Sequence, residues 1–209
     1  MIELVPESNV SQLDLPKIFG RAAPLQVDLG CGDGSFLCSL AERFPDKNFL
    51  GIERLAGRVA KTAGKAANIG NVRVLHAETA YAVRYLLPEC SVETFYLLFP
   101  DPWPKRRHHR RRIFTRIFLD SIFRALEPDG LLRVATDDLD YFRQIERCTA
   151  DAMKEAPSNL DRLKHSSCQR FQMDTGDDTV LPPTKFEKRF RAQDLPIYRL
   201  ALRKISPVI

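Results

Sequence analysis

The segment "LQVDLGCGDGSFLCSLAERFP", residues 25–45, decides the fold of this chain. Leu25–Leu29 is a short apolar run typical of a buried strand. Apolar residues at helical spacing begin at Phe36 and end at Pro45, which predicts a helix. Three glycines separate the two elements: Gly30, Gly32 and Gly34. A buried strand, a glycine-rich turn and a helix in this order indicate the start of a βαβ unit.

The same alternation continues outward from this segment. Further strands are predicted at 48–53, 71–76, 92–99 and 131–136, and helices at 55–68, 80–87, 113–126 and after Asp138, which caps the last of them. The segment "EPDG", residues 127–130, is predicted to be a turn. The segment "PIYRLALRK", residues 196–204, has the alternation of a final strand, antiparallel at one edge. We therefore predict an α/β fold with a Rossmann-like, doubly wound, mainly parallel sheet and an antiparallel edge strand. No linker or repeat divides the chain, so residues 1–209 are expected to form a single domain.

Acidic residues recur at the ends of the predicted strands. Five carboxylates lie at or just after successive strand ends: Asp28, Glu53, Glu78, Asp101 and Asp137. Each acid alone is compatible with a loop residue or a helix cap. In a parallel sheet, however, ligands bind beyond the carboxyl ends of the strands. Five like charges gathered there would repel one another without a ligand, so together they predict a binding site.

The glycine loop indicates the kind of ligand. Its spacing is GxGxG, whereas the dinucleotide fingerprint is GxGxxG, and this difference disfavours a nicotinamide dehydrogenase. Asp28 lies two residues before the first glycine, where a carboxylate would disfavour a diphosphate and favour a cationic or amine-bearing ligand. Glu53 ends a strand at a position where an acid can bind two ribose hydroxyls, and Glu78 can contact an adenine.

A rigid, cationic segment follows the fourth long strand. In "LLFPDPWPKRRHHRRRIF", residues 97–114, Asp101 and Trp103 each precede a proline, which restricts their backbones. Trp103 could stack on a base or pack within the loop. Six cations follow: Lys105, Arg106, Arg107, Arg110, Arg111 and Arg112. The other 26 of the 32 Lys and Arg nearly balance the 27 Asp and Glu, so the positive charge is concentrated here. Such a patch favours a polyanionic partner over a merely solvated surface.

Composition limits the other possibilities. The chain is 44% hydrophobic and 28% charged, as is ordinary for a globular protein, and no apolar run approaches the ~20 residues of a membrane span. The N-terminal residues show no secretory pattern, and the five cysteines form no CxxC pair. We therefore expect a cytoplasmic protein with reduced thiols, no bound metal and no membrane partner.

Three segments together carry a family resemblance. "FPDPWPKRRHHRRR" at 99–112, "TDDLDYF" at 136–142 and "TKFEKR" at 184–189 resemble the bacterial tRNA (guanine-N7)-methyltransferases. The resemblance extends from about Asp28 to Arg203 and implies the class I methyltransferase fold, S-adenosylmethionine as cofactor, and tRNA as partner and substrate. The implied reaction is methylation of N7 of the guanine in the tRNA variable loop.

The resemblance also implies roles for individual residues. Cofactor binding is implied for the glycine loop and four acids: Gly30, Gly32, Gly34, Asp28, Glu53, Glu78 and Asp101. Asp101 is, in addition, the implied catalytic residue. Substrate binding is implied for Lys105, Asp137, Thr184, Lys185, Phe186 and Glu187. RNA contact is implied for Arg107, His108, His109, Arg110, Arg111 and Arg112.

Two positions depart from the usual family pattern, and some alternatives stay open. Asp28 is often Glu in the family, and Glu78 stands where Asp is common; both changes keep the charge. Thr184 and Glu187 could simply cap a short helix, with Phe186 packed inward. A non-catalytic RNA-binding protein would keep the cationic block but would not need the glycine loop and its acids. A small-molecule methyltransferase would need the loop but not the cationic block.

Overall fold

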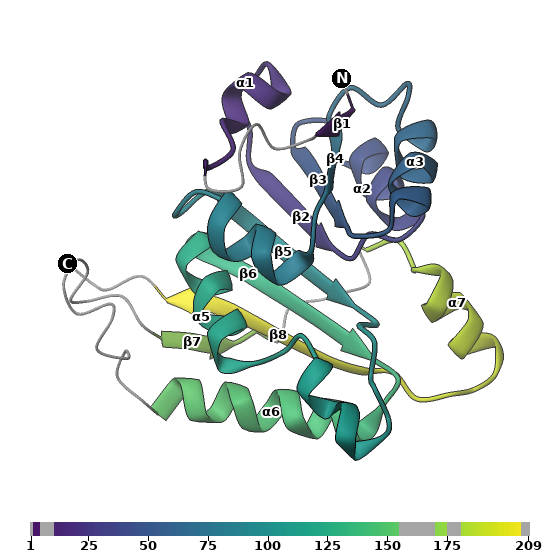
Figure 1. Ribbon diagram of the computed structural model, residues 1–209, viewed down its shortest axis with the longest axis vertical. Coiled ribbons are helices and arrows are strands. Elements are labelled where there is room, and N and C mark those ends of the chain that lie inside the picture. Colours follow the sequence, from purple (N-terminus) through teal and green to yellow (C-terminus); the bar gives the residue numbers. More distant parts are fainter. Residues whose placement is uncertain (1, 5–10, 155–169, 175–180, 206–209) are drawn as a thin grey trace.

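The computed structural model describes residues 2–4, 11–154, 170–174 and 181–205. These form an eight-stranded sheet in the order β1-β4-β3-β2-β5-β6-β8-β7, with helices on both faces (Figure 1). The strands are β1 (Glu3–Leu4), β2 (Leu25–Leu29), β3 (Asn48–Glu53), β4 (Val72–His76), β5 (Val92–Leu98), β6 (Leu126–Thr136), β7 (Arg170–Met173) and β8 (Tyr198–Ile205). The helices are α1 (Leu15–Phe19), α2 (Ser35–Arg43), α3 (Ala56–Lys65), α4 (Thr79–Tyr81), α5 (Arg116–Ala125), α6 (Leu139–Lys154) and α7 (Lys185–Ala192). A π-helix, η1 (Ala82–Leu86), continues α4, and a 3₁₀-helix, η2 (Arg106–Arg111), precedes α5.

Alternation along the central strands gives the sheet an apolar core on each face. In β2, Leu25, Val27 and Leu29 point into the larger core, which also contains side chains of η1, α5 and α6. In β3 and β5, Phe49 and Tyr96 point to the opposite face, where α2 and α3 cover them. Since successive strand residues point to opposite faces, Asp28 lies on the α2 side of the sheet.

The sheet has a topological switch point between β2 and β5. The chain runs from β2 through β3 to β4 on one side, then crosses to β5 and continues to β6 on the other. All of these neighbouring pairs are parallel. The loops after β2 and β5 therefore diverge at the same edge and leave a crevice, the usual ligand position in open α/β sheets.

The predicted fold class is confirmed, with corrections at the edges. β8 is antiparallel to β6 as predicted, but it is not the outermost strand, because β7 pairs with its other side. The short elements β1, α1 and β7 were not predicted, since two to five residues show no clear period. Residues 127–130, predicted to be a turn, form an irregular part of β6, where the pairing register with β5 shifts.

A helix was predicted over 113–126 and is confirmed as α5, but its predicted start, directly continuing the cationic block, was wrong. α5 begins only at Arg116, and the Thr115 hydroxyl caps it by accepting a hydrogen bond from the backbone N–H of Phe118 (3.2 Å). The extended residue Arg112 and the cap at Thr115 separate the cations from α5, so the cations form the separate turn η2.

Candidate active site

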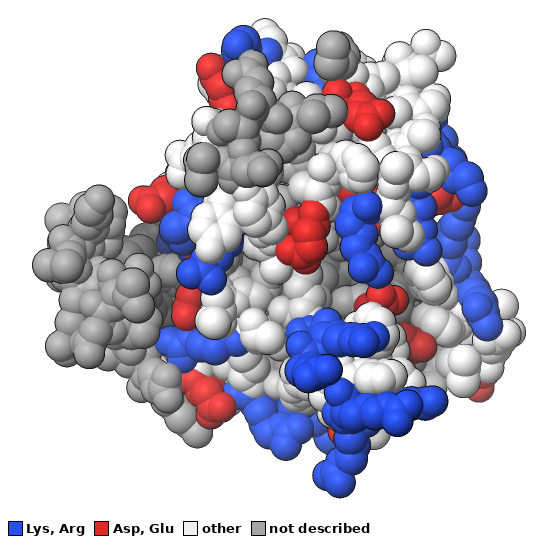
Figure 2. Space-filling view, viewed as in Figure 1, with Lys and Arg blue, Asp and Glu red and all other residues white. Residues whose placement is uncertain are grey.

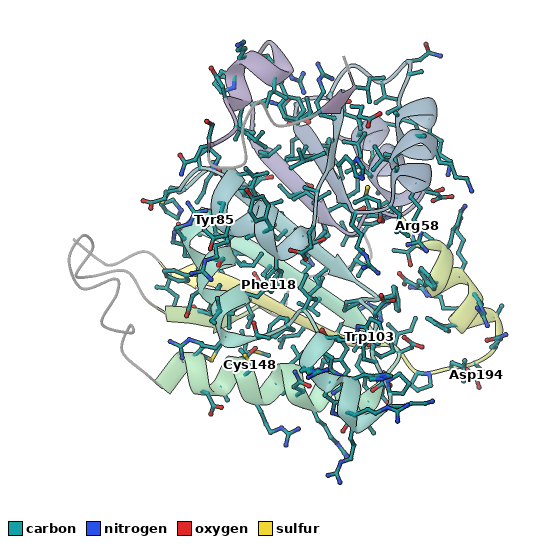
Figure 3. All side chains as sticks on the ribbon, in the orientation of Figure 1. Arg58, Tyr85, Trp103, Phe118, Cys148 and Asp194 are labelled. Atoms are coloured by element: carbon teal, nitrogen blue, oxygen red, sulfur yellow. The ribbon has the colours of Figure 1, made fainter. Side chains whose placement is uncertain are left out.

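A cavity of about 610 Å³ lies at the carboxyl ends of β2 and β5. The glycine loop after β2, the segment after β5 and the start of α7 all line it. The lining includes ten of the residues expected in the site: Asp28, Gly30, Gly32, Glu53, Glu78, Asp101, Arg111, Thr184, Lys185 and Phe186. Segments more than 150 residues apart in sequence thus meet around one hollow, as the switch point requires. Arg58 and Trp103 lie at two ends of this region (Figure 3).

The glycine loop depends on backbone conformations that favour glycine. Gly30, Gly32 and Gly34 all have positive φ angles, of 78°, 60° and 73°. A Cβ at Gly34 would also lie 2.6 Å from the methyl group of Thr62, which is fully buried in α3. The Thr62 hydroxyl donates a hydrogen bond to the carbonyl of Gly32 (3.2 Å), so α3 holds the loop from behind.

Glu53 ties the loop to the end of β3. One of its carboxylate oxygens accepts a hydrogen bond from the Gly32 N–H (3.1 Å), and the other accepts one from the Leu55 N–H (2.9 Å). Arg58 lies 3.8 Å from the same carboxylate. Glu53 is only 3% exposed, so its charge faces the cavity from a buried, oriented position.

Asp28 is a buried carboxylate that lines the cavity. Its side chain is 4% exposed, and no hydrogen bond among the described residues ends on it. Burial, together with the nearby charge of Glu53, raises the pKa of Asp28 from 3.8 to about 7. A buried, unpaired acid beside a cavity suits a ligand that brings positive charge.

Glu78 has a structural task as well as a place in the lining. Its two carboxylate oxygens accept hydrogen bonds from the N–H groups of Ala80 (3.0 Å) and Tyr81 (2.7 Å), so it caps α4. The helix-cap alternative therefore holds for Glu78, while its exposed carboxylate still borders the cavity.

The proline-rich segment after β5 brings Asp101 to the cavity. The φ angles of Phe99 and Trp103 are positive, 53° and 46°, which is unusual for non-glycine residues and characteristic of functional loops. Asp101, between these two residues, is exposed and lines the cavity. Trp103 also lines it, and its ring contacts His108 edge-on (5.9 Å between centroids) and lies under the guanidinium of Arg111 (4.8 Å).

The cationic block forms an exposed ridge beside the cavity. Five of its members are exposed, and we call them the cationic ridge: Lys105, Arg106, Arg107, Arg110 and Arg111. Figure 2 shows Lys and Arg side chains gathered over this part of the molecule. His108 and His109 are partly buried between them. A dense row of exposed cations is the expected footprint of a phosphate backbone.

Arg112 does not belong to this ridge, which corrects the prediction that it contacts RNA. It is 3% exposed, and its guanidinium donates hydrogen bonds to the Pro102 carbonyl (2.6 Å), Gln144 (2.8 Å) and Asp140 (2.8 Å). The hydrogen bond from Arg112, together with its charge, lowers the pKa of Asp140. Its guanidinium also lies over the Tyr141 ring (4.8 Å). Arg112 therefore fixes the proline-rich segment to α6, a role that sequence spacing could not show.

The "TKFEKR" segment forms the start of α7 against the cavity. The Thr184 hydroxyl accepts a hydrogen bond from the Glu187 N–H (3.0 Å), so Thr184 is the helix cap. Phe186 is 53% exposed, so the alternative in which it packs inward is wrong. Its ring contacts the ring of Phe99 at the cavity, with 5.9 Å between the centroids. The carboxylate of Glu187 pairs with Arg191 and with Arg199 of β8 (2.7 Å) and is not among the lining residues.

Lys185 connects α7 to the glycine loop. Its ammonium group forms an ion pair with Asp33, which also pairs with Lys65 of α3 (2.7 Å). These lysines and Ser35 donate hydrogen bonds that keep the pKa of Asp33 below its usual range, despite partial burial. Asp33 was missed in the sequence because its partner Lys185 lies 152 residues away.

Several predicted site residues lie outside the cavity lining. They are Gly34, Lys105, Asp137, Glu187, Arg107, His108, His109, Arg110 and Arg112. Asp137 follows β6 directly and is exposed, whereas Lys105 is on the ridge. Conversely, Arg58, Phe99 and Asp33 line the cavity and were not predicted, because nothing in their local sequence distinguishes them.

Among the described residues, no group of acids, cysteines and histidines is placed to hold a metal, and no helix is long and apolar enough to cross a bilayer.

The fold and the cavity define the class of protein. The 16S rRNA methyltransferase KamB is similar to this chain, with a TM-score of 0.59 and 18% identity over 94% of this chain and 95% of that structure. The antibiotic-resistance methyltransferase Kmr is similar over 93% of both chains, with a TM-score of 0.57 and 18% identity. The chain therefore has the fold of the class I S-adenosylmethionine-dependent methyltransferases. The family model described as "Putative methyltransferase" matches residues 22–200.

Curated relatives define the family within that class. The tRNA (guanine-N(7)-)-methyltransferase of Halorhodospira halophila is 38% identical over 94% of this chain and 82% of the relative. Those of Thermotoga maritima and Nitrosococcus oceani are 34% and 32% identical over 93% and 92% of this chain, which spans 58% and 76% of their lengths. The chain belongs to the tRNA (guanine-N(7)-)-methyltransferase family. This confirms the resemblance seen in the sequence, and with it the enzyme class and the cofactor.

Proposed function

We propose that this chain methylates N7 of a guanine in tRNA, specifically the guanine of the variable loop, with S-adenosylmethionine as donor. The observation that carries the proposal is that Asp28 and Asp101 line one cavity, which borders the cationic ridge. A donor site without such a ridge would fit a small-molecule enzyme, and a ridge without the donor site would fit a binding protein. Both are present, and the chain's relatives carry the corresponding name.

The residues that line the cavity near the ends of β2 and β3 fit S-adenosylmethionine. When bound, this cofactor supplies a methyl group activated by a positively charged sulfur, together with an ammonium group. The unpaired carboxylate of Asp28 would compensate positive charge, and Glu53 is oriented toward ligand hydroxyls at the end of β3. Gly30, Gly32 and Gly34 leave the loop backbone open to close approach, and Glu78 borders the same space.

Residues at the cavity mouth would position the guanine. Guanine N7 already has an exposed lone pair, so the reaction needs no general base to remove a proton. Alignment supplies much of such a rate enhancement, roughly 7–11 kcal/mol in favourable cases. We assign Asp101 to this position, where its carboxylate would stabilise the positive charge that develops on the methylated purine. Its place between two prolines favours a fixed orientation.

The remaining assignments follow from position. Thr184, Lys185 and Phe186 line the cavity from α7 and would contact the substrate there. Asp137 and Lys105 lie at neighbouring loops and would contact it from the rim, while Glu187 would act by holding α7 to β8 through Arg199. The exposed part of the 107–111 block would bind phosphates, which gives affinity without sequence information.

The direct experiment is methyl transfer from labelled S-adenosylmethionine to unmodified tRNA, followed by nucleoside analysis. We expect label only in 7-methylguanosine, and only in tRNA that has a guanine in its variable loop. Label in another nucleoside, or equal labelling after that guanine is replaced by adenine, would contradict the proposal.

Asp101→Ala tests the assigned reaction centre. Because Asp101 is exposed, its removal should leave the unfolding midpoint unchanged, while kcat falls by about 100-fold or more, in the range of a lost electrostatic contact to a transition state. Steady-state kinetics and thermal unfolding measure the two effects. Asp46→Ala, at an exposed turn before β3, is the control. Unchanged kcat in Asp101→Ala would remove this residue from the mechanism.

We further propose that residues 1–209 act as a single methyltransferase domain and that the protein works in the cytoplasm, where tRNA is available. The continuous sheet that joins both halves of the cavity supports the first proposal.

A further inference from the structure

A second hollow of about 430 Å³ adjoins the cavity, between η1 and α5. We call it the η1–α5 groove. Glu78, Arg111 and Ile113 line both hollows, so the two share a wall. None of the predicted functions accounts for this groove, and its volume is within the range of small-ligand sites.

One side of the groove is aromatic and exposed. The rings of Tyr81 and Tyr85 lie 5.2 Å apart at 45°, and Tyr85 is 44% exposed (Figure 3). The guanidinium of Arg84 lies over the Tyr85 ring at 5.2 Å. On the α5 side, Ile117 is 61% exposed. Tyrosine rings and arginine planes at a surface are the groups on which unpaired bases stack.

The backbone that presents these side chains is unusual and firmly held. Residues 82–86 are wound as a π-helix, a rare form that occurs frequently at functional sites. Val83 and Leu86 are fully buried, while Arg84 and Tyr85 point outward. The Arg124 guanidinium of α5 donates hydrogen bonds to the carbonyls of Val83 (2.9 Å) and Leu87 (2.7 Å), which fixes the turn to α5.

The charges around the groove favour a phosphate at one end. Arg84 and Arg111 are exposed and line it, and Arg111 also stands between the groove and Trp103 at the cavity. The acid in the lining, Glu78, has both oxygens engaged in capping α4. A nucleotide would therefore place its phosphate near the arginines and its base over Tyr85.

We propose that the η1–α5 groove binds an unpaired nucleotide adjoining the target guanine, with its base stacked on Tyr85 and its phosphate against Arg84 and Arg111. This inference rests on the proposed function, because it takes the occupant of the neighbouring cavity to be a guanine of an RNA strand. The groove would keep the strand open beside the reacting base and so add to the selection of a loop guanine over a paired one.

Tyr85→Ala is the main test, with Tyr85→Trp as the conservative variant. Loss of one base–aromatic stack should raise KM for tRNA about fivefold to tenfold while kcat is kept. Tyr85→Trp should stay within about twofold of the wild type. Binding of S-adenosylhomocysteine, measured by calorimetry, should be equal in all variants. Met173→Ala, at a 52% exposed position on β7, is the control for loss of an exposed side chain.

Two modified tRNAs locate the stacked base: one has an abasic residue directly before the target guanine, and the other has one directly after it. The wild type should lose affinity for one of the two abasic tRNAs, and Tyr85→Ala should show no further loss on that tRNA. An unchanged KM in Tyr85→Ala, or equal losses in both enzymes on both abasic tRNAs, would overturn the proposal.

The two proposals fail in different ways. If the wild type forms no 7-methylguanosine, the proposed function fails, and the groove is then judged by filter binding of a short unpaired RNA. If Tyr85→Ala binds that RNA more weakly than Met173→Ala does, the proposed nucleotide site is supported. Equal binding by the two variants would contradict it.

Discussion

At the scale of single residues, Asp28 shows how a binding group differs from a stabilising one. Its buried carboxylate has no partner among the described residues, and burial beside Glu53 raises its pKa from 3.8 to about 7. The folded state therefore holds the proton more tightly than the unfolded chain does. The stability from this proton is fully present below about pH 4 and is lost as the pH rises to 7.

Asp28→Asn should become progressively more stable relative to the wild type between pH 4 and pH 7. A shift from 3.8 to about 7 corresponds to a change of up to ~4 kcal/mol in the difference in unfolding free energy. Urea unfolding of both proteins at the two pH values measures it, and Asp46→Asn is the exposed control. The same difference at pH 4 and pH 7 would show that Asp28 does not titrate as described.

Arg112 is the residue whose role differs most from that predicted in the sequence. Arg112→Ala should lower the unfolding free energy by ~1–3 kcal/mol, because the Pro102 carbonyl and Gln144 lose a buried partner. Arg110→Ala, two residues earlier and exposed, should leave stability within ~0.5 kcal/mol. Chemical unfolding distinguishes the two variants. Equal stability of both would mean that Arg112 does not hold the proline-rich segment.

At the scale of elements, the glycine loop requires both its backbone angles and its close packing. Gly34→Ala should lower the unfolding free energy by about 2–4 kcal/mol, because φ is 73° and the added Cβ would lie 2.6 Å from Thr62. Gly57→Ala is the matched control: this glycine lies in α3 with nothing within 4 Å of an added Cβ, so the change should be neutral or stabilising by up to ~1 kcal/mol. If Gly34→Ala were as stable as Gly57→Ala, the packing of the loop on α3 would be disproved.

Elements with a clear period were predictable, and those set by distant partners were not. β2 and β3 have the predicted bounds, since both are fully buried apolar runs closed by turns. The start of α5 was misplaced, because the apolar residues Ile113 and Phe114 extend its period although they precede the cap at Thr115. For the site, the order of acids and glycines predicted the cavity, whereas the pairing of Asp33 with Lys185 and the burial of Arg112 depend on contacts that no local pattern encodes.

At the scale of the whole molecule, most of the exposed cations expected to bind RNA lie outside the cavity in which methyl transfer is expected. Replacing Arg106, Arg107 and Arg110 together by Ala should weaken tRNA binding and reduce the slope of log K against log salt by about 2–3, as each lost phosphate contact removes ~0.7–0.9. None of the three lines the cavity, so kcat at saturating tRNA should be unchanged. Filter binding across a salt series measures the slope.

The control replaces three exposed cations on other elements: Lys17, Arg43 and Lys61. It removes the same net charge, so a slope that falls equally in both triple variants would indicate a general charge effect. A slope that falls only in the ridge variant assigns the phosphate contacts to the ridge.

The switch point between β2 and β5 has a consequence for how such an enzyme can change its target. The groups suited to the methyl donor come from β2, β3 and the loops after them, before the crossover, whereas the proline-rich segment, the ridge and α7 all come after it. Because each half carries its own share of the cavity wall, we expect substitutions on the cavity side of the later half to change the acceptor and to leave the donor groups in place. A change of target would then need no change in the strands and loops before the crossover.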